Sequence, residues 1–150
     1  MPLLVFHVFE GRSQQEIAAL LDATHRVVLD TLHVPQRDRY QIVHEHKASH
    51  VRFEDTGLGI ARSNKFVLVH VFTRPHATEL KTAFYRNLCD DLQRSCNISP
   101  SDVMVSIFGN TDEDWSFGLG RAQFLTGELG GPKAGQAAPS STSKQPAHSS

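Results

Sequence analysis

The sequence predicts an α/β (α+β) fold in which two tandem β-α-β units form a four-stranded mixed sheet with both helices on one face. The first observation is an internal repeat, because LLVFHVF at 3–9 returns as FVLVHVF at 66–72, an offset of 63 residues. The second is the order of patterns within each copy, which is strand, helix, strand. Two copies of one unit therefore account for the core of the chain.

The repeat continues beyond the first strand of each copy. Glu16-Ile17 falls on Glu79-Leu80 at the same offset, and after a one-residue slip VPQRD at 34–38 falls on ISPSD at 98–102. The repeat units then span about 2–45 and 65–109.

Each copy contains one amphipathic helix. The first runs from about Ser13, an N-cap with Glu16 in capping-box spacing, to about His33. The second begins near Thr78, shortly after Pro75. Apolar side chains recur at helical spacing in both, so each helix has one buried face. These stripes are Ile17, Leu20, Leu21, Thr24, Val28 and Leu32 in the first helix, and Leu80, Ala83, Phe84, Leu88, Leu92 and Cys96 in the second.

Short strands follow the helices, at 40–44 and 103–108. A strand, a long crossover helix and a second strand predict a parallel pair with a right-handed crossover. The strands are continuous apolar runs, so the sheet face opposite the helices is also apolar. The chain has little left to cover that face, and self-association is expected.

Composition limits the class of protein. The 150 residues suit one domain, assigned to 2–129 with a C-terminal segment at 110–129, and the Gly-, Pro- and Ser-rich stretch 130–150 is expected to be a disordered tail. A net charge of -1 and no basic run argue against nucleic-acid and membrane-surface partners. No targeting segment is visible, and Cys89 and Cys96, seven residues apart on one helix, are too far apart to bridge. A cytoplasmic protein with reduced thiols is expected.

Several motifs together resemble one family. They are Pro2 at the head of the first unit, VPQRDRYQIV at 34–43, EDTGLG at 54–59, TRPH at 73–76 and DWSFGLGRAQFLTGEL at 114–129. In combination they resemble the tautomerase superfamily, and within it the malonate semialdehyde decarboxylases. The resemblance covers Pro2 to about Leu129 and implies a homotrimer that acts on a small carboxylate substrate with no metal and no organic cofactor.

The resemblance also implies a set of site residues. Pro2, freed by removal of Met1, matches the catalytic amino-terminal proline, Asp38 an assisting aspartate, and Arg74 an arginine that holds the substrate carboxylate. A second arginine is expected two positions after Arg74, where this chain has His76. Side chains that match an apolar wall of the site are Trp115, Phe117, Phe124 and Leu129.

These residue types suit the chemistry. A free proline amine titrates not far from neutrality, where desolvation favours the neutral base and a nearby Asp38 favours the cation. A cationic Pro2 stabilises the enolate left when carbon dioxide departs, whereas a neutral Pro2 abstracts a proton next to a carbonyl. Arg74 can grip a carboxylate with two parallel hydrogen bonds, but His76 offers one N–H and titrates near neutrality.

Three functions remain open from the sequence. The favoured one is decarboxylation of malonate semialdehyde to acetaldehyde and carbon dioxide, and the first alternative is a keto–enol tautomerase or hydratase acting on a small 2-oxo or unsaturated acid. The second is a non-catalytic binding or signalling protein with the same fold.

Some of the site residues also have a structural explanation. Proline is tolerated at the start of a strand, and Asp38 and Asp102 can both be acidic residues of a turn. His44 and His46 share a strand face, but two imidazoles make a poor metal site.

Overall fold

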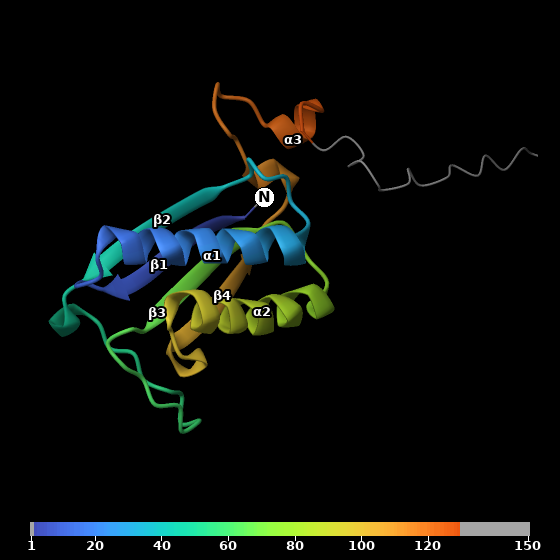
Figure 1. The fold of residues 1–150 in the computed structure, drawn as a ribbon. Helices are drawn as coiled ribbons and strands as arrows, with labels where there is room; N and C mark the ends of the chain where they lie inside the picture. The colour runs from blue at the N-terminus through green and yellow to red at the C-terminus, as the bar shows by residue number, and fades with distance from the viewer. Residues whose placement is uncertain (1, 130–150) are drawn as a thin grey trace, which may run out of the picture. The chain divides into compact units, whose positions relative to one another are not determined.

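The computed structural model describes residues 2–129, and the expected disordered tail at 130–150 lies outside the described residues. The chain divides into two units, Met1–Thr111 and Asp112–Ser150. The first unit contains both repeats (Figure 1). Among the described residues, no helix has the length and apolar character needed to cross a membrane.

The first unit has the predicted strand and helix order. Its strands form one sheet in the order β2-β1-β3-β4. β1 pairs with β2 and β3 with β4 in parallel, and the central pair β1 and β3 is antiparallel. The predicted mixed sheet of two β-α-β units is therefore confirmed. The main elements are β1 (Leu3–Phe9), α1 (Gln14–Leu32), β2 (Tyr40–His46), β3 (Val67–Thr73), α2 (Thr78–Cys96) and β4 (Val103–Gly109).

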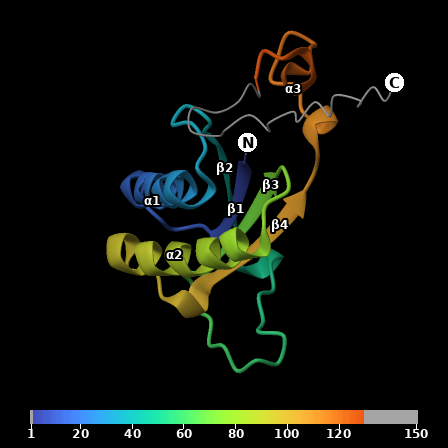
Figure 2. The same ribbon diagram turned by 90° about the vertical axis from the view of Figure 1, so that its right-hand side faces the viewer.

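Both helices lie side by side on one face of the sheet (Figures 1 and 2). Alternate residues of β1 and β3 point toward them and are buried, as the strand period requires. The predicted helical stripes meet these residues in one core. Its largest fully buried side chains include Phe6, Phe66, Phe84, Leu4, Leu20, Leu88 and Leu92.

The helix ends show where the two repeats differ. The Ser13 hydroxyl accepts from the Glu16 N–H, and the Glu16 carboxylate accepts from the Ser13 N–H, which is the predicted capping box. In the second repeat the N-cap is Ala77, which has no side-chain oxygen, so α2 begins without a capping hydrogen bond. The two helices are offset by 64 residues, whereas the equivalent buried positions of the inner strands, such as Leu4 and Val67, are offset by 63, so the slip falls before the second helix. The sequence alignment placed that slip too late, because Glu16 and Glu79 coincide by residue type.

The strand bounds differ slightly from the prediction. β2 continues to His46, beyond the expected end at residue 44, because its pairing with β1 extends to Phe9. The second inner strand begins at Val67, since Phe66 closes a turn by donating its N–H to the Ser63 carbonyl at 3.2 Å.

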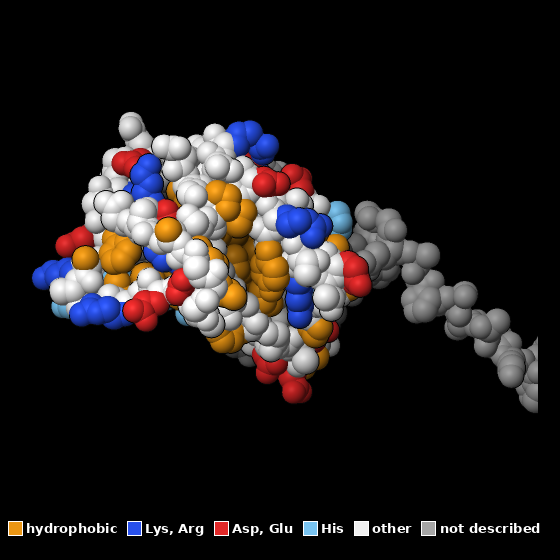
Figure 3. Space-filling view, turned by 90° about the horizontal axis from the view of Figure 1, so that it is seen from below, with side chains coloured by type: hydrophobic (Ala, Val, Ile, Leu, Met, Phe, Trp, Pro, Cys, Tyr) orange, Lys and Arg blue, Asp and Glu red, His pale blue; other side chains and the backbone are white. Residues whose placement is uncertain are grey.

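The sheet face opposite the helices, called here the outer face, is also rich in apolar side chains. Leu3, Val5, Leu68 and Phe72 lie on it and are half-buried. The edge strands add exposed apolar side chains, among them Ile42 and Phe108 at 46% and 43% exposure. Figure 3 views the molecule from below and not onto this face, and in that view too hydrophobic side chains gather in the middle with charged side chains around them. The prediction of a second apolar sheet face is thus confirmed.

Candidate active site

Strand register brings three of the predicted site residues to one end of the sheet. Leu3 pairs with Tyr40 on one side and with Phe72 on the other. Pro2 lies one residue before this row, Asp38 lies two residues before Tyr40 in the turn that leads into β2, and Arg74 lies two residues after Phe72, just beyond the end of β3. With a rise of about 3.3 Å per residue, all three backbones lie within about 7 Å of the row. Asp38 and Arg74 therefore flank the Pro2 strand from opposite sides.

Pro2 and Asp38 are both buried at this end. Asp38 ends a tight turn, in which its N–H donates to the Pro35 carbonyl at 2.9 Å, and it is only 5% exposed. The same turn recurs before β4, where Asp102 is the equivalent residue. Asp38 and Asp102 therefore both end a turn that leads into a strand, as the alternative structural role predicted for them requires.

The two aspartates nevertheless have different surroundings. The Asp102 carboxylate accepts two hydrogen bonds from Ser63, from its N–H and its hydroxyl, each at 2.6 Å. These bonds tie the turn before β4 to the segment that precedes β3. Asp102 thus has a structural role, whereas Asp38 occupies the equivalent position next to Pro2.

Arg74 and His76 lie in the loop between β3 and α2. Both side chains are half-buried. His76 Nε2 forms a hydrogen bond of 3.1 Å with the hydroxyl of Thr73, the last residue of β3. The Thr73 carbonyl in turn accepts from the Asn110 N–H at 2.8 Å. The loop that carries both residues is therefore fastened to the ends of two strands.

The four predicted wall residues belong to the C-terminal unit, and three of them form an aromatic group. The rings of Trp115 and Phe117 stack at 5.5 Å with 6° between their planes, and Phe124 meets Phe117 edge-on at 5.5 Å. Leu129 is 37% exposed. Sequence reasoning gave this segment no helix of its own, but the short helix α3 (Gln123–Thr126) carries Phe124.

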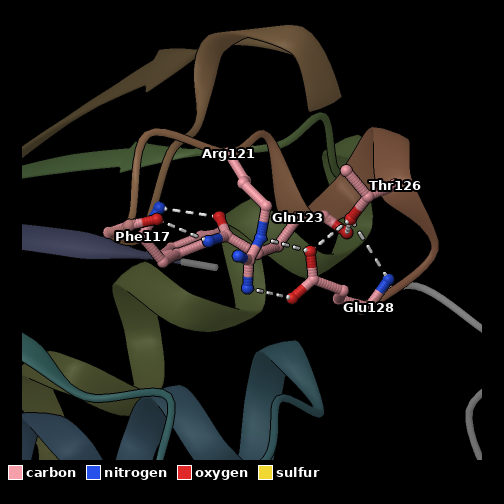
Figure 4. Close-up of polar contacts among 6 residues, drawn as sticks. Phe117, Arg121, Gln123, Thr126 and Glu128 are labelled. Carbon is pink, nitrogen blue, oxygen red and sulfur yellow. Dashed lines mark hydrogen bonds and ion pairs between the residues drawn. The ribbon is translucent and has the colours of Figure 1, made fainter.

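Gln123 organises this aromatic group, and sequence reasoning missed it. Its side chain is buried, and its Oε1 accepts from the Phe117 N–H at 2.9 Å while its Nε2 donates to the Gly118 carbonyl at 2.8 Å (Figure 4). Arg121 holds Glu128 through two hydrogen bonds of 3.0 Å, which lower the pKa of that carboxyl. The loop before α3 is thus closed by one buried amide.

A second feature was missed, a histidine cluster on the outer face made of His7, His44, His46 and His70. The His7 ring lies 5.0 to 5.3 Å from each of the other three. Burial lowers the pKa of His7, and the neighbouring imidazoles lower it further. The available signal was the repeated HVF, which puts His7 and His70 on the same sheet face. Over the described residues, no group of three or more His, Cys, Asp or Glu could hold a metal ion.

The sheet end around Pro2 combines groups that can act on a small acid. Asp38 puts a buried carboxylate at the same end of the sheet as Pro2, and Arg74 supplies a planar cation that suits a carboxylate ligand. His76 adds one further nitrogen close to Arg74, already hydrogen-bonded to Thr73. This set can bind an anion and move one proton.

Comparison with known proteins identifies the family. Two tautomerase enzyme families match the chain, one over residues 38–118 and the other over 2–61. The chain is 50% identical to the probable tautomerase YrdN of Bacillus subtilis (strain 168) over 129 residues, which cover 86% of this chain and all of that protein.

Solved structures give the same relationship. A structure of malonate semialdehyde decarboxylase, described with decarboxylase and hydratase activities, is 50% identical with a TM-score of 0.83, covering 85% of this chain and 98% of the other. A fused 4-OT described as a symmetric trimer is 25% identical with a TM-score of 0.69, covering 83% and 98%. The fold, the repeat and these matches together show that the chain belongs to the tautomerase superfamily.

Proposed function

We propose that this chain decarboxylates malonate semialdehyde to acetaldehyde and carbon dioxide, without a metal or an organic cofactor. The observation that carries the proposal is the meeting of Pro2, Asp38 and Arg74 at one end of the sheet. The 50% identity to a malonate semialdehyde decarboxylase supports the choice of substrate.

Each residue has a separate part in the proposed mechanism. Arg74 binds the substrate carboxylate through its planar guanidinium, and His76 adds a weaker hydrogen bond. Pro2, after removal of Met1, carries a secondary amine, and the carboxylate of Asp38 favours its protonated form. The cationic amine then donates a hydrogen bond to the aldehyde oxygen of the substrate.

The reaction breaks one carbon–carbon bond. The electron pair of the bond to the carboxylate passes toward the carbonyl, carbon dioxide leaves, and the resulting enolate is stabilised by the cationic Pro2. A proton added at carbon gives acetaldehyde. The family resemblance assigns Trp115, Phe117, Phe124 and Leu129 to an apolar wall, and such a wall would lower the local dielectric and strengthen these electrostatic interactions.

We also propose that the protein is a homotrimer in which the outer faces of three copies meet. The apolar side chains of that face support this, because such a patch is costly to leave in water. The trimer described for the fused 4-OT supports it as well.

The test of the proposed function is product analysis with matched variants. The wild-type chain is expected to convert carbon-13-labelled malonate semialdehyde to acetaldehyde and carbon dioxide, and intact mass is expected to show that Met1 is absent. Pro2→Ala is expected to reduce the rate by about a hundredfold or more, because it replaces the secondary amine, which the proline ring holds in one orientation, by a freely rotating primary amine. Pro100→Ala, an exposed proline in the second repeat, serves as the control. Retained Met1, or full turnover by Pro2→Ala, would contradict the mechanism.

A tautomerase or hydratase acting on a small 2-oxo or unsaturated acid is the second candidate. His76 favours it, because a single imidazole cannot replace the fixed charge of a second arginine. Turnover of such an acid without release of carbon dioxide would establish this reaction at the same site. Absence of turnover with every acid tested would favour a non-catalytic binding or signalling role.

A further inference from the structure

A second pocket lies at the opposite end of the sheet from Pro2. It is formed by the loop after β1, the start of α1, the segment before β3 and the end of α2, and its volume is about 560 Å³. That volume is within the range of small-molecule sites. All of its lining residues belong to the first unit.

This pocket occupies the position that the internal repeat makes equivalent to the Pro2 end. β1 and β3 are antiparallel, so the segments that precede them lie at opposite ends of the sheet. Lys65 stands 63 residues after Pro2, and the left-handed cap Asn97 stands 64 after the cap His33. The second copy therefore has a pocket at the position equivalent to the Pro2 end, with a lysine in place of the proline.

The pocket contains three basic side chains, Arg12, Lys65 and Arg94. Arg12 is half-buried, and its Nη2 donates to the Lys65 carbonyl at 2.6 Å, which holds the two segments together. Burial lowers the pKa of Arg12, although it stays protonated, so an anion in the pocket would offset part of its lost hydration.

The acidic side chains of the lining offset this charge only in part. Glu16 accepts from the Ser13 N–H at 3.1 Å, which directs its carboxylate to the start of α1. Glu10 is exposed. Asp91 pairs with Arg94 at 3.6 Å from outside the lining. The lining itself has three cations and two carboxylates, and with Arg94 paired to Asp91 the cations left to meet an anion are Arg12 and Lys65.

Apolar side chains complete the lining, among them Phe9, Ala19 and Ile98. A bare inorganic anion would gain nothing from them, whereas a short hydrocarbon chain would. We propose that this pocket is a second binding site, distinct from the Pro2 end, for a small organic acid with at least one carboxylate. Without a proline at position 65 the site binds its ligand and does not decarboxylate it.

The test uses the full chain labelled with nitrogen-15 and titrated with malonate. Arg74→Gln removes the carboxylate anchor proposed at the Pro2 end, so shifts that remain report on the second pocket alone. In that background, the amides of Gly11, Asn64 and Asn97 are expected to shift and saturate. This outcome does not depend on the proposed decarboxylation.

Two further variants and a control make the result specific. Lys65→Gln and Arg12→Gln, each in the Arg74→Gln background, are expected to weaken malonate binding about tenfold, the effect of one charge-assisted hydrogen bond. Arg86→Gln, exposed on α2 and outside the lining, is expected to leave it unchanged. Unchanged binding in both pocket variants, with well-dispersed spectra, would overturn the proposal. Equal affinity for inorganic phosphate would overturn the assignment of an organic acid.

Discussion

His7 and His46 are hydrogen-bonded to each other on the outer face, with His7 Nδ1 2.8 Å from His46 Nε2. One ring must donate and the other must accept, so at least one of the two imidazoles is neutral in this geometry. His44 and His70 lie against His7 as well. Protonation of the cluster would place like charges within a few ångströms of one another.

The first prediction is that the fold loses stability in mild acid. The pKa of His7 is lowered in the fold from its ordinary 6.5, so the unfolded chain binds this proton more readily. The contribution to stability is therefore full above about pH 6.5 and is lost as the pH falls below that value and through the lowered pKa of folded His7. The melting temperature is expected to fall between about pH 7.5 and 5.5, by about 2–4 °C for each kcal/mol lost.

Two histidine variants separate the cluster from general acid effects. His7→Phe keeps a planar ring on the outer face without a titrating group, and its melting temperature is expected to depend less on pH. His50→Gln, at an exposed histidine away from the cluster, is expected to behave as wild type. An equally steep pH profile in His7→Phe would show that the cluster is not responsible.

The second prediction concerns His76. His76→Arg supplies the fixed charge and the planar fork that the imidazole lacks, so the KM for malonate semialdehyde is expected to fall about tenfold near neutral pH. Because histidine side chains in general gain charge in mild acid, the wild-type KM is expected to improve between about pH 8 and pH 6, while that of the variant stays flat. His50→Arg adds the same charge elsewhere as a control. A wild-type kcat/KM that does not change over this range would remove His76 from the site.

The third prediction concerns Gln123. Gln123→Ala removes the two hydrogen bonds that close the loop between Phe117 and α3, at a local cost of about 1–3 kcal/mol. Trp115 is the one tryptophan of the chain and stacks on Phe117, so its emission is expected to shift to longer wavelength. Arg121→Gln breaks only an exposed ion pair and is expected to shift the emission less. Identical spectra for wild type and Gln123→Ala would contradict the role given to the amide.

The fourth prediction tests the proposed homotrimer. Val5 lies on the outer face between Ile42 and His70 on the neighbouring strands. Val5→Asp would bury a charge if these faces meet, and light scattering after size exclusion is expected to show a monomer. Thr82→Asp, exposed on α2, is the matched control. A Val5→Asp chain with the wild-type mass would place the contact between copies elsewhere.

The sequence was sufficient for the fold and for most of the individual site residues. Side-chain periodicity identifies the strands and helices, because the period of each element can be read from residues close together in the sequence. The repeat at 63 residues then gives their order. The family resemblance then marked Pro2, Asp38 and Arg74. The sequence could not show that the repeat offset changes from 63 to 64 residues before α2. The N-cap of that helix is Ala77, whose side chain cannot form the capping hydrogen bond that marks a helix start in a sequence.

Relations between strands were decided only by the tertiary structure. The registers of β1 with β2 and β3 put Pro2 between Asp38 and Arg74, and the same registers bring together four histidines from three strands. The buried amide of Gln123 and the basic pocket beside Lys65 likewise depend on contacts between separate segments. Local pattern sets which face a side chain occupies, but only the pairing of distant segments decides which side chains meet there.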